Sequence, residues 1–371
     1  MRVLLVSNMY AYPGNWDKLD ALGKRVELGV VMPSAWHTNE LHPVQAVPAN
    51  APDASWKQYR LDTWFQFQGN PFRYIYQPQQ LAAAIAQFQP DLVHVEQEPE
   101  SLSLLQLSAL KRRYGYRLIF VAWENIHPLR LGVVFRMLNY AAADAGIVGN
   151  QEAHRRCRRL GFRKRLDVIP QYGFAIDPAR PQTADPNRPF AIGYAGRLVP
   201  EKGIHTLYDA IRQLPEIHVR IAGDGPLAEL LGRDPHYELL GTLPRGEMRQ
   251  FWQSIDVLVV PSLTTPRWAE QFGRVIVEAM AAGVPVIGSS SGAIPEVIGE
   301  AGLIFPEGDA AALANMIRRL HNSPSQRAAL VERGYERLRR CYSHEVVMGR
   351  TVDFYRDVLA ATGATSTPMV S

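Results

Sequence analysis

Short apolar runs alternate along the first half of the chain with longer amphipathic stretches. The apolar runs are rich in branched residues and end in polar or glycine positions, as buried parallel strands do; they cover 3–7, 27–32, 92–96, 117–123, 145–150 and 166–170. The stretches between them repeat apolar residues at helical spacing, at 17–24, 77–88, 101–114, 131–142 and 151–160. Residues 33–72 are expected to form long loops with short strands. This alternation predicts a doubly wound parallel α/β sheet.

The same pattern starts again after a segment without periodicity. Residues 173–189 combine Pro, Asp and Asn and are interpreted as a linker. Beyond it we expect strands at 190–196, 218–223, 237–243, 256–260 and 302–309, one more starting at Val284, and helices at 204–214, 247–254, 309–321 and 324–340. The prediction is two Rossmann-like domains, 1–175 and 176–342, with a C-terminal helix at about 343–371 returning to the first.

Composition narrows the class of protein only slightly. At 371 residues the chain is long enough for two cores, and its two cysteines, Cys157 and Cys341, define no disulfide framework or metal pattern. No apolar run approaches the length of a membrane span. A cytoplasmic protein is therefore expected.

Positive charge is concentrated in the first half. Residues 1–172 hold 20 Lys and Arg against 14 Asp and Glu, a net +6, whereas the remainder is −2. The densest runs are 154–165 and 111–113. Such runs fit peripheral contact with an anionic membrane, a phosphorylated acceptor, or merely a solvated helix end. No nucleic-acid-binding motif is present, so no nucleic acid partner is expected.

Candidate chemistry centres on residues 261–285, PSLTTPRWAEQFGRVIVEAMAAGVP. We expect a helix to start near Phe272 or Gly273 and to stop at Gly283. The backbone N–H groups around Phe272, Gly273 and Arg274 would then form an anion site at the helix N-terminus. Glu270 and Glu278 flank it and could accept hydrogen bonds from hydroxyls. A nucleotide sugar, with a diphosphate between two sugars, would suit this arrangement.

Two further turns carry phosphate-binding features. In GRLVPEKG the strand ends at Gly196, and Arg197 and Lys202 could reach one diphosphate. In AGDGP the glycines allow a tight turn, while Asp224 is expected to cap the following helix rather than to bind the ligand, although it stays a donor-side candidate.

These motifs, in this order, resemble the retaining, nucleotide-sugar-dependent glycosyltransferases of the GT4-like group. The segment from Glu270 to Glu278 is similar to their E-x7-E motif, and the resemblance covers nearly all of 190–310. It implies the GT-B fold, in which two Rossmann-like domains face a central cleft. It further implies transfer of a hexosyl group from a nucleoside-diphosphate sugar to an acceptor hydroxyl with retention, in cell-envelope or exopolysaccharide synthesis.

The resemblance also implies roles for these residues. Arg197, Lys202 and the helix amides would stabilise the leaving diphosphate, Glu270 would hold donor sugar hydroxyls, and Glu278 would accept from the ribose. Family members of this kind need no metal or other cofactor, and the chain has no Asp-x-Asp pattern.

The first domain resembles the family only in its strand–helix order. Its first loop, from Asn8 to Gly14, has one glycine where the family is often glycine-rich. Glu124 takes the place of a family histidine, and His127 follows three residues later. Glu96, Glu98 and Glu100 follow another strand and are candidates for acceptor contacts, with solvated loop acids as the alternative. We predict Asn8, Gly14, Glu96 and His127 on the acceptor side and Glu124 among the catalytic residues.

Three alternatives remain open. A nucleotide-sugar epimerase of the same fold would release free sugar from donor alone. A non-catalytic sugar-nucleotide-binding subunit would bind donor without turnover. A dinucleotide-dependent dehydrogenase is disfavoured because no G-x-G-x-x-G follows the first strands.

Overall fold

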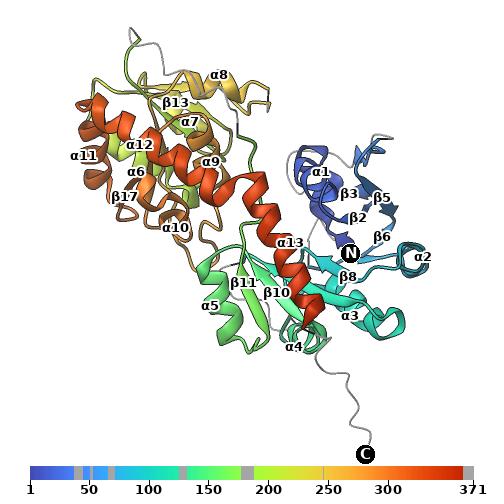
Figure 1. The fold of residues 1–371 in the computed structure, drawn as a ribbon. Helices are drawn as coiled ribbons and strands as arrows, with labels where there is room; N and C mark the ends of the chain where they lie inside the picture. The colour runs from blue at the N-terminus through green and yellow to red at the C-terminus, as the bar shows by residue number, and fades with distance from the viewer. Residues whose placement is uncertain are drawn as a thin grey trace, which may run out of the picture. The chain divides into compact units, whose positions relative to one another are not determined.

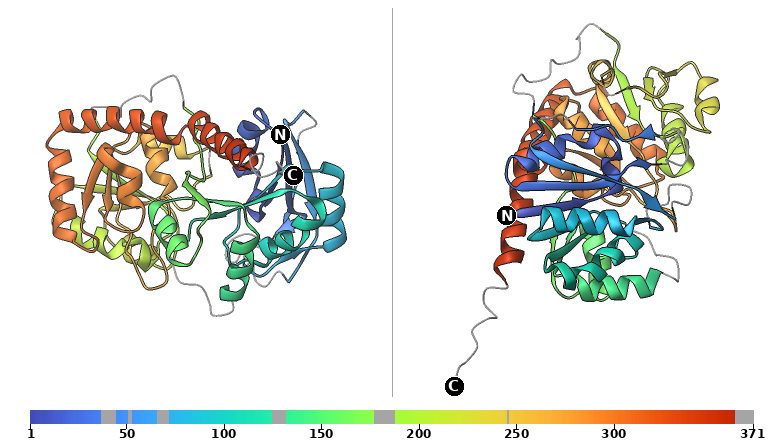
Figure 2. Two further views of the ribbon diagram at one scale, coloured as in Figure 1. Left: turned by 60° about the horizontal axis from the view of Figure 1, so that its bottom comes forward. Right: turned by 90° about the vertical axis from the view of Figure 1, so that its right-hand side faces the viewer.

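The computed structural model describes residues 1–36, 45–50, 53–65, 72–124, 132–176, 188–244 and 246–361. The chain divides into two compact units (Figures 1 and 2). Unit 1 consists of Met1–Gly173 and the chain from Val347 onward, and unit 2 is Phe174–Val346. The last helix is His344–Ala360, and the chain rejoins unit 1 at Val347, within its first turn.

Unit 1 is built on a seven-stranded parallel sheet. Its strand order is β11-β10-β9-β8-β1-β2-β5. The strands are β1 (Arg2–Val6), β2 (Glu27–Pro33), β5 (Trp56–Leu61), β8 (Leu92–Val95), β9 (Arg117–Ala122), β10 (Ala145–Val148) and β11 (Arg165–Val168). The order reverses between β1 and β8, which makes the sheet doubly wound and places a ligand-binding switch point at their carboxyl ends.

Helices cover both faces of this sheet. Alternate residues of β1 enter two separate cores: Leu4 and Val6 pack with one set of helices, Val3 and Leu5 with the other. The first set is α2 (Pro78–Phe88), α3 (Leu102–Tyr114), α4 (Gly132–Ala142) and α5 (Gln151–Arg159), and the second is α1 (Asp17–Gly23) and α13 (His344–Ala360). The C-terminal helix is therefore part of the unit 1 core.

The region from 33 to 72 contains more regular structure than expected. β5 pairs with β2 in register over six residues, and its Trp56 is buried. Two short antiparallel pairs accompany it: β3 (Ala35–Trp36) with β4 (Gln45–Ala46), and β6 (Thr63–Trp64) with β7 (Ile75–Tyr76). The sequence did not predict β5 as a strand of the main sheet, because proline and polar residues surround it. Its pairing with β2 is a tertiary contact that local patterns do not show.

Unit 2 repeats the architecture with six parallel strands. The order is β14-β13-β12-β15-β16-β17, and it reverses between β12 and β15. The strands are β12 (Ala191–Ala195), β13 (His218–Ala222), β14 (Tyr237–Leu239), β15 (Val257–Val260), β16 (Val286–Ser289) and β17 (Gly302–Phe305). The helices are α6 (Ile204–Ile211), α7 (Ala228–Gly232), α8 (Met248–Gln253), α9 (Arg274–Ala281), α10 (Ile294–Ile298), α11 (Ala310–His321) and α12 (Pro324–Arg337), followed by a π-helical turn at Leu338–Tyr342.

Candidate active site

The switch point of unit 2 is built from glycine turns that pack on one another. Gly203, with φ of +71°, lies so close to β15 that a Cβ there would stand 1.9 Å from the carbonyl oxygen of Pro261. A Cβ on Gly223 would stand 1.9 Å from the carbonyl oxygen of Gly196. The two predicted phosphate-binding turns, after β12 and after β13, are therefore in direct contact.

Lys202 and Glu270 meet at this switch point although they are 68 residues apart. The Nζ of Lys202 donates to Oε2 of Glu270 at 2.6 Å, and Ser262 donates to the same oxygen at 3.2 Å. The Lys202 ammonium also lies 4.4 Å from the ring centre of Trp268. Their side chains are 19% and 11% exposed, so the pair is screened from most of the solvent yet remains reachable.

Arg197 projects from the same turn toward solvent. Its side chain is 54% exposed, and its nearest acid is Glu201 at 3.9 Å. Its carbonyl accepts a hydrogen bond from the hydroxyl of buried Tyr194 at 2.7 Å. Burial and the nearby Glu270 raise the pKa of Tyr194, so this hydroxyl stays protonated and holds the turn. Sequence reasoning missed Tyr194 and Ser262, because both lie in apolar or loop positions without a motif.

The glutamate loop leads into α9 as expected. The helix begins at Arg274 after the N-cap Gly273, whose φ is +72° and which has no side chain to cap the helix. Phe272 stacks on Phe174 at 6.4 Å between ring centres, which anchors the loop in the core of unit 2. Glu278 lies in α9, and its Oε1 is 3.8 Å from Nε of Arg274.

Asp224 does not cap a helix, so that prediction was wrong. Its Oδ1 accepts a hydrogen bond from the N–H of the next residue, Gly225, at 2.7 Å, whereas the N-cap of α7 is Leu227, with no side-chain cap. The turn is held instead by backbone hydrogen bonds to the neighbouring turn after β12, since the N–H of Leu198 donates to the carbonyl of Asp224 at 2.9 Å.

In unit 1, Glu96 is enclosed in an internal network at the β8 end. Its carboxylate accepts hydrogen bonds from Lys18 and from the Tyr10 hydroxyl, the latter at 2.8 Å, and its side chain is 1% exposed. The pKa of Glu96 is lowered, because Lys18 and its other partners outweigh burial. The predicted acceptor contact by Glu96 is not supported, because both oxygens face protein groups.

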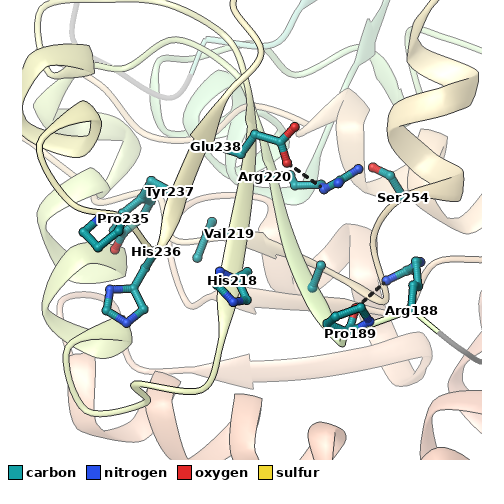
Figure 3. Close-up of a pocket in the computed structure, with 11 residues that line it drawn as sticks. Arg188, Pro189, His218, Val219, Arg220, Pro235, His236, Tyr237, Glu238 and Ser254 are labelled. Carbon is teal, nitrogen blue, oxygen red and sulfur yellow. Dashed lines mark hydrogen bonds and ion pairs between the residues drawn. The ribbon is translucent and has the colours of Figure 1, made fainter.

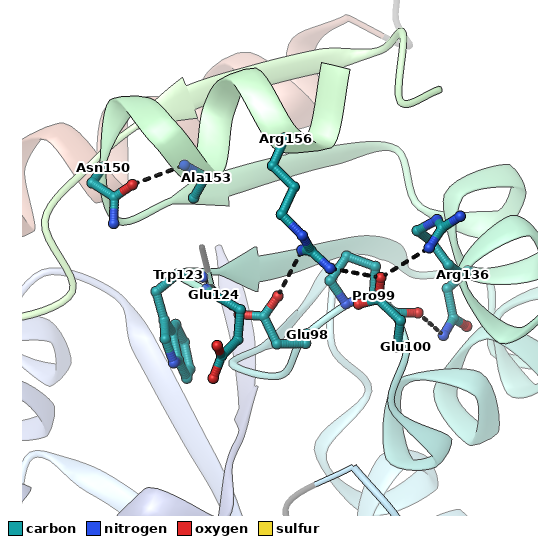
Figure 4. A network of polar contacts seen from close by, with 10 residues as sticks. Glu98, Pro99, Glu100, Trp123, Glu124, Arg136, Asn150, Ala153 and Arg156 are labelled. Atoms are coloured by element: carbon teal, nitrogen blue, oxygen red, sulfur yellow. Dashed lines mark hydrogen bonds and ion pairs between the residues drawn. The ribbon is translucent and has the colours of Figure 1, made fainter. Parts of the chain in front are cut away.

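A second buried cluster joins the ends of β8 and β9 to α4 and α5 (Figure 4). Glu100 accepts from Arg136 at 3.2 Å and from Arg156 at 3.0 Å. Glu98 accepts from the backbone N–H groups of Trp123 and Glu124 at 2.7 and 2.9 Å. The alternative that these acids are solvated is therefore wrong.

Glu98 and Glu124 influence one another through this cluster. Burial first, and then the charge of Glu124, raise the pKa of Glu98 to about 8 despite the counteracting Arg156 at 3.6 Å. The other Glu98 oxygen, Oε2, is buried without a hydrogen bond among the described residues. A carboxyl group that holds its proton near neutral pH thus supports the backbone of Glu124.

Two of the remaining acceptor-side candidates, Asn8 and Gly14, lie in the first loop. Asn8 accepts a hydrogen bond from the side-chain amide of Gln97 at 2.5 Å. Gly14 lies in a 3₁₀ turn, Pro13–Asn15, and nothing would come within 4 Å of a Cβ there. His127 falls outside the described residues.

A separate pocket of about 240 Å³ opens at the amino ends of the unit 2 strands, where Arg188, His218, Arg220 and Glu238 line it (Figure 3). Arg220 is paired with Glu238 at 3.0 Å and Arg188 with Asp256 at 2.7 Å. Its charges are thus balanced, and it lies at the sheet edge opposite the glycine turns.

Two features are absent from the described residues. None of the helices in these ranges has the length and apolar character needed to cross a bilayer. Within the same ranges, His, Cys, Asp and Glu side chains do not gather into a group that could hold a metal ion.

Comparison with known proteins agrees with this architecture. Residues 176–337 match the family model described as glycosyl transferases group 1. This part of the chain, nearly all of unit 2, therefore carries a domain of the glycosyl transferases group 1 type.

Curated relatives match a part of their length. The lipopolysaccharide core biosynthesis glycosyltransferase LpsE of Rhizobium meliloti is 31% identical over 216 residues, 54% of this chain and 60% of the relative. The sulfoquinovosyl transferase SQD2 of Arabidopsis thaliana is 33% identical over 149 residues, 38% of this chain and 28% of the relative. The chain thus spans between about a quarter and three-fifths of these relatives.

Solved structures match nearly the whole chain. Sucrose-phosphate synthase from Thermosynechococcus elongatus superposes with a TM-score of 0.75 at 22% identity, covering 98% of this chain and all of the other. Anabaena HepE in complex with UDP superposes with a TM-score of 0.73 at 18% identity, covering 96% of this chain and all of the other. At such identities the likeness establishes the fold, which is GT-B, as the sequence predicted.

Proposed function

We propose that the chain is a retaining glycosyltransferase that moves a hexosyl group from a nucleoside-diphosphate sugar to an acceptor hydroxyl. The single observation that carries this proposal is the ion pair between Lys202 and Glu270 at the unit 2 switch point. This pair brings a cation and a carboxylate to within 2.6 Å of each other beside a helix N-cap, and the carboxylate could accept hydrogen bonds from sugar hydroxyls. A diphosphate linked to a sugar presents the complementary groups, an anion and nearby hydroxyls.

In the proposed reaction the bond between the anomeric carbon and the diphosphate oxygen breaks, and a bond to the acceptor oxygen forms. Arg197, Lys202 and the amino end of α9 would stabilise the negative charge that develops on the leaving diphosphate. Glu270 would hold the donor sugar and Glu278 the ribose. The acceptor proton would leave with the diphosphate or with a base on the unit 1 side, where Glu124 is the candidate.

Names of similar proteins support the substrate class. HepE structures include complexes with UDP and with UDP-glucose. Curated relatives carry the names of lipopolysaccharide core, colanic acid and capsular polysaccharide glycosyltransferases. We therefore propose a UDP- or GDP-linked hexose as donor and a cell-envelope glycan, its lipid-linked precursor or a related small molecule as acceptor.

We further propose that no metal ion is needed, because Arg197 and Lys202 supply the positive charge that a metal would bring. Retention of transfer activity in excess chelator is the expected result. A cytoplasmic location is also proposed, and it is supported by two free cysteines, Cys157 and Cys341.

The test is a panel of nucleotide sugars, screened first by thermal shift and then by product analysis, with wild type and Glu270→Ala. We expect Glu270→Ala to bind nucleoside diphosphate nearly as well as wild type and to lose transfer by about 10²- to 10³-fold. Glu229→Ala is the matched control, since Glu229 is 77% exposed on α7 and pairs only with Arg233 on its own helix in the described structure.

Three results would overturn the proposal. Unchanged transfer by Glu270→Ala would show that Glu270 is not part of the active site. Release of free sugar epimer from donor alone would indicate an epimerase. Tight donor binding by wild type with no turnover across acceptors would indicate a non-catalytic binding subunit.

A further inference from the structure

Helix α4 exposes apolar side chains to solvent and buries polar ones. Four large apolar residues face solvent: Val133, Val134, Met137 and Leu138 are 38%, 59%, 65% and 51% exposed. Their spacing of one and four residues places them on one helical face. In the described part of the chain nine large hydrophobic residues are exposed, and α4 alone holds these four.

Polar contacts on the opposite face explain the orientation of α4. Asn139 is fully buried, and its amide donates to the carbonyls of Pro99 and Ser101 at 2.8 and 3.3 Å. Arg136 is 8% exposed and pairs with buried Glu100, as Figure 4 shows. A rotation of α4 that hid the apolar face would expose Asn139 and leave Glu100 with one partner fewer. The apolar face is therefore fixed outward.

Positive side chains gather at the carboxyl end of α4. Lys111 donates to the carbonyl of Ala142 at 2.6 Å, and Lys164 donates to those of Ala141 and Ala143 at 2.9 and 2.5 Å. Arg112 and Arg113 follow Lys111 on α3, which packs beside α4, and both are exposed. The sequence from 101 to 172 has 13 Lys and Arg against four Asp and Glu, a net +9.

We propose that the outer face of α4 docks on an anionic lipid bilayer surface. Val133, Val134, Met137 and Leu138 would enter the boundary between headgroups and acyl chains. The exposed Arg112 and Arg113 would meet lipid phosphates. An apolar helix face bordered by excess positive charge is complementary to an anionic bilayer surface, which offers both acyl chains and phosphates. A second copy of the chain would bring the same positive charge to the contact and would be repelled.

The docking is independent of sugar transfer in its chemistry. If the glycosyltransferase proposal is correct, docking would bring the enzyme close to lipid-linked acceptors. Vesicle binding needs no nucleotide, so failure of one proposal leaves the other measurable.

The experiment measures flotation of the full chain with phosphatidylcholine vesicles, with or without phosphatidylglycerol. Wild type is expected to bind only the anionic vesicles and to be released by high salt. Met137→Gln/Leu138→Gln should weaken binding by at least about tenfold, because two apolar anchors are lost. Arg112→Glu/Arg113→Glu should abolish the preference for anionic lipid.

Leu239→Gln is the matched control, since Leu239 is 37% exposed on β14 of unit 2. It should float as wild type does. Transfer to a soluble acceptor should be unchanged in Met137→Gln/Leu138→Gln, which shows that the variant is folded.

Two outcomes would overturn the proposal. Equal flotation of wild type and the α4 variant would show that this face does not touch lipid. A wild-type dimer that the α4 variant dissociates, together with absence of vesicle binding, would assign the face to self-association.

Discussion

The carboxyl ends of the strands are covered differently in the two sheets, by backbone turns in unit 2 and by charged side chains in unit 1. In unit 2 the edge consists of glycine turns in van der Waals contact, with one partly exposed ion pair and an exposed arginine. In unit 1 the corresponding edge is filled by charged side chains that neutralise one another inside the protein. One edge leaves backbone and cations open to a ligand, while the other is closed around its own charges.

The difference shows where each unit is intolerant of change. A backbone edge depends on single positions that only glycine can occupy. A side-chain edge depends on protonation, because buried carboxylates and imidazoles gain or lose their partners with pH. The following experiments test this contrast, starting with the largest expected effect.

Replacement of Gly203 by alanine should be the most damaging change. Its φ of +71° and the 1.9 Å approach to the Pro261 carbonyl force the backbone to move, so we expect a loss of at least ~3 kcal/mol in the free energy of unfolding. Gly14→Ala in the first loop of unit 1 has open space and should stay within about 0.5 kcal/mol. Denaturant titration measures both, and equal losses would contradict the contrast.

Acidification should weaken unit 1 through His94. Burial, followed by the repulsion of Lys18, lowers the pKa of His94 to about 4 from 6.5, despite the attraction of Glu96. The folded form thus excludes a proton that the unfolded chain binds. Stability is complete above pH 6.5 and falls as the pH drops toward 4, by about 3 kcal/mol in total.

His94→Gln serves as the probe, because it removes the titrating ring and keeps a polar group facing Tyr355. Its unfolding free energy should depend less on pH between 7 and 4.5 than that of wild type. Parallel pH profiles for the two proteins would exclude His94 as the source.

Alkaline pH should act on Glu98 in the opposite sense. Its pKa is raised to about 8, so its contribution is complete below the unfolded value of 4.5 and is lost as the pH rises through 8. Glu98→Gln mimics the protonated form. We expect near-equal stability at pH 5 and a relative gain of at least about 3 kcal/mol for the variant at pH 9.

Glu100→Gln is the control for this experiment. It weakens the contacts to two guanidinium groups and should destabilise the protein at pH 5 and pH 9 alike. If Glu98→Gln behaved in the same way, Glu98 would be an ordinary buried anion.

The smallest stability effect is expected at Arg197. Its side chain is 54% exposed with its acid partner at 3.9 Å, so Arg197→Ala should change the unfolding free energy by less than ~0.5 kcal/mol. Affinity for UDP, measured by calorimetry, should nevertheless fall by about tenfold if the guanidinium contacts the diphosphate. Unchanged UDP affinity would leave Arg197 outside the donor site.

The sequence was most informative where the backbone itself is constrained. Gly196, Gly203 and Gly273 all have positive φ, and each marks a strand end or helix start that the sequence predicted. The family resemblance implied that Lys202 and Glu270 serve one ligand. The observed strand order explains their contact, since the ends of β12 and β15 are neighbours at the switch point. Local sequence patterns are therefore enough to predict these glycine turns and helix starts.

The sequence was least informative where burial depends on distant partners. Three glutamates after a strand suggested a solvated loop, but α1, α4 and α5 supply Lys18, Arg136 and Arg156 to enclose them. β5 was hidden because its pairing with β2 is a tertiary event. Asp224 looked like a helix cap because spacing alone does not show where α7 begins.

The return of the C-terminal helix has a consequence for biosynthesis. Phe354 and Tyr355 of α13 are almost fully buried in the unit 1 core, where the Tyr355 hydroxyl lies 2.5 Å from Nδ1 of His94. A ribosome that has finished residues 1–173 has therefore not yet made part of that core, and all of unit 2 is translated in between. The nascent unit 1 therefore keeps part of one sheet face uncovered until α13 has been synthesised.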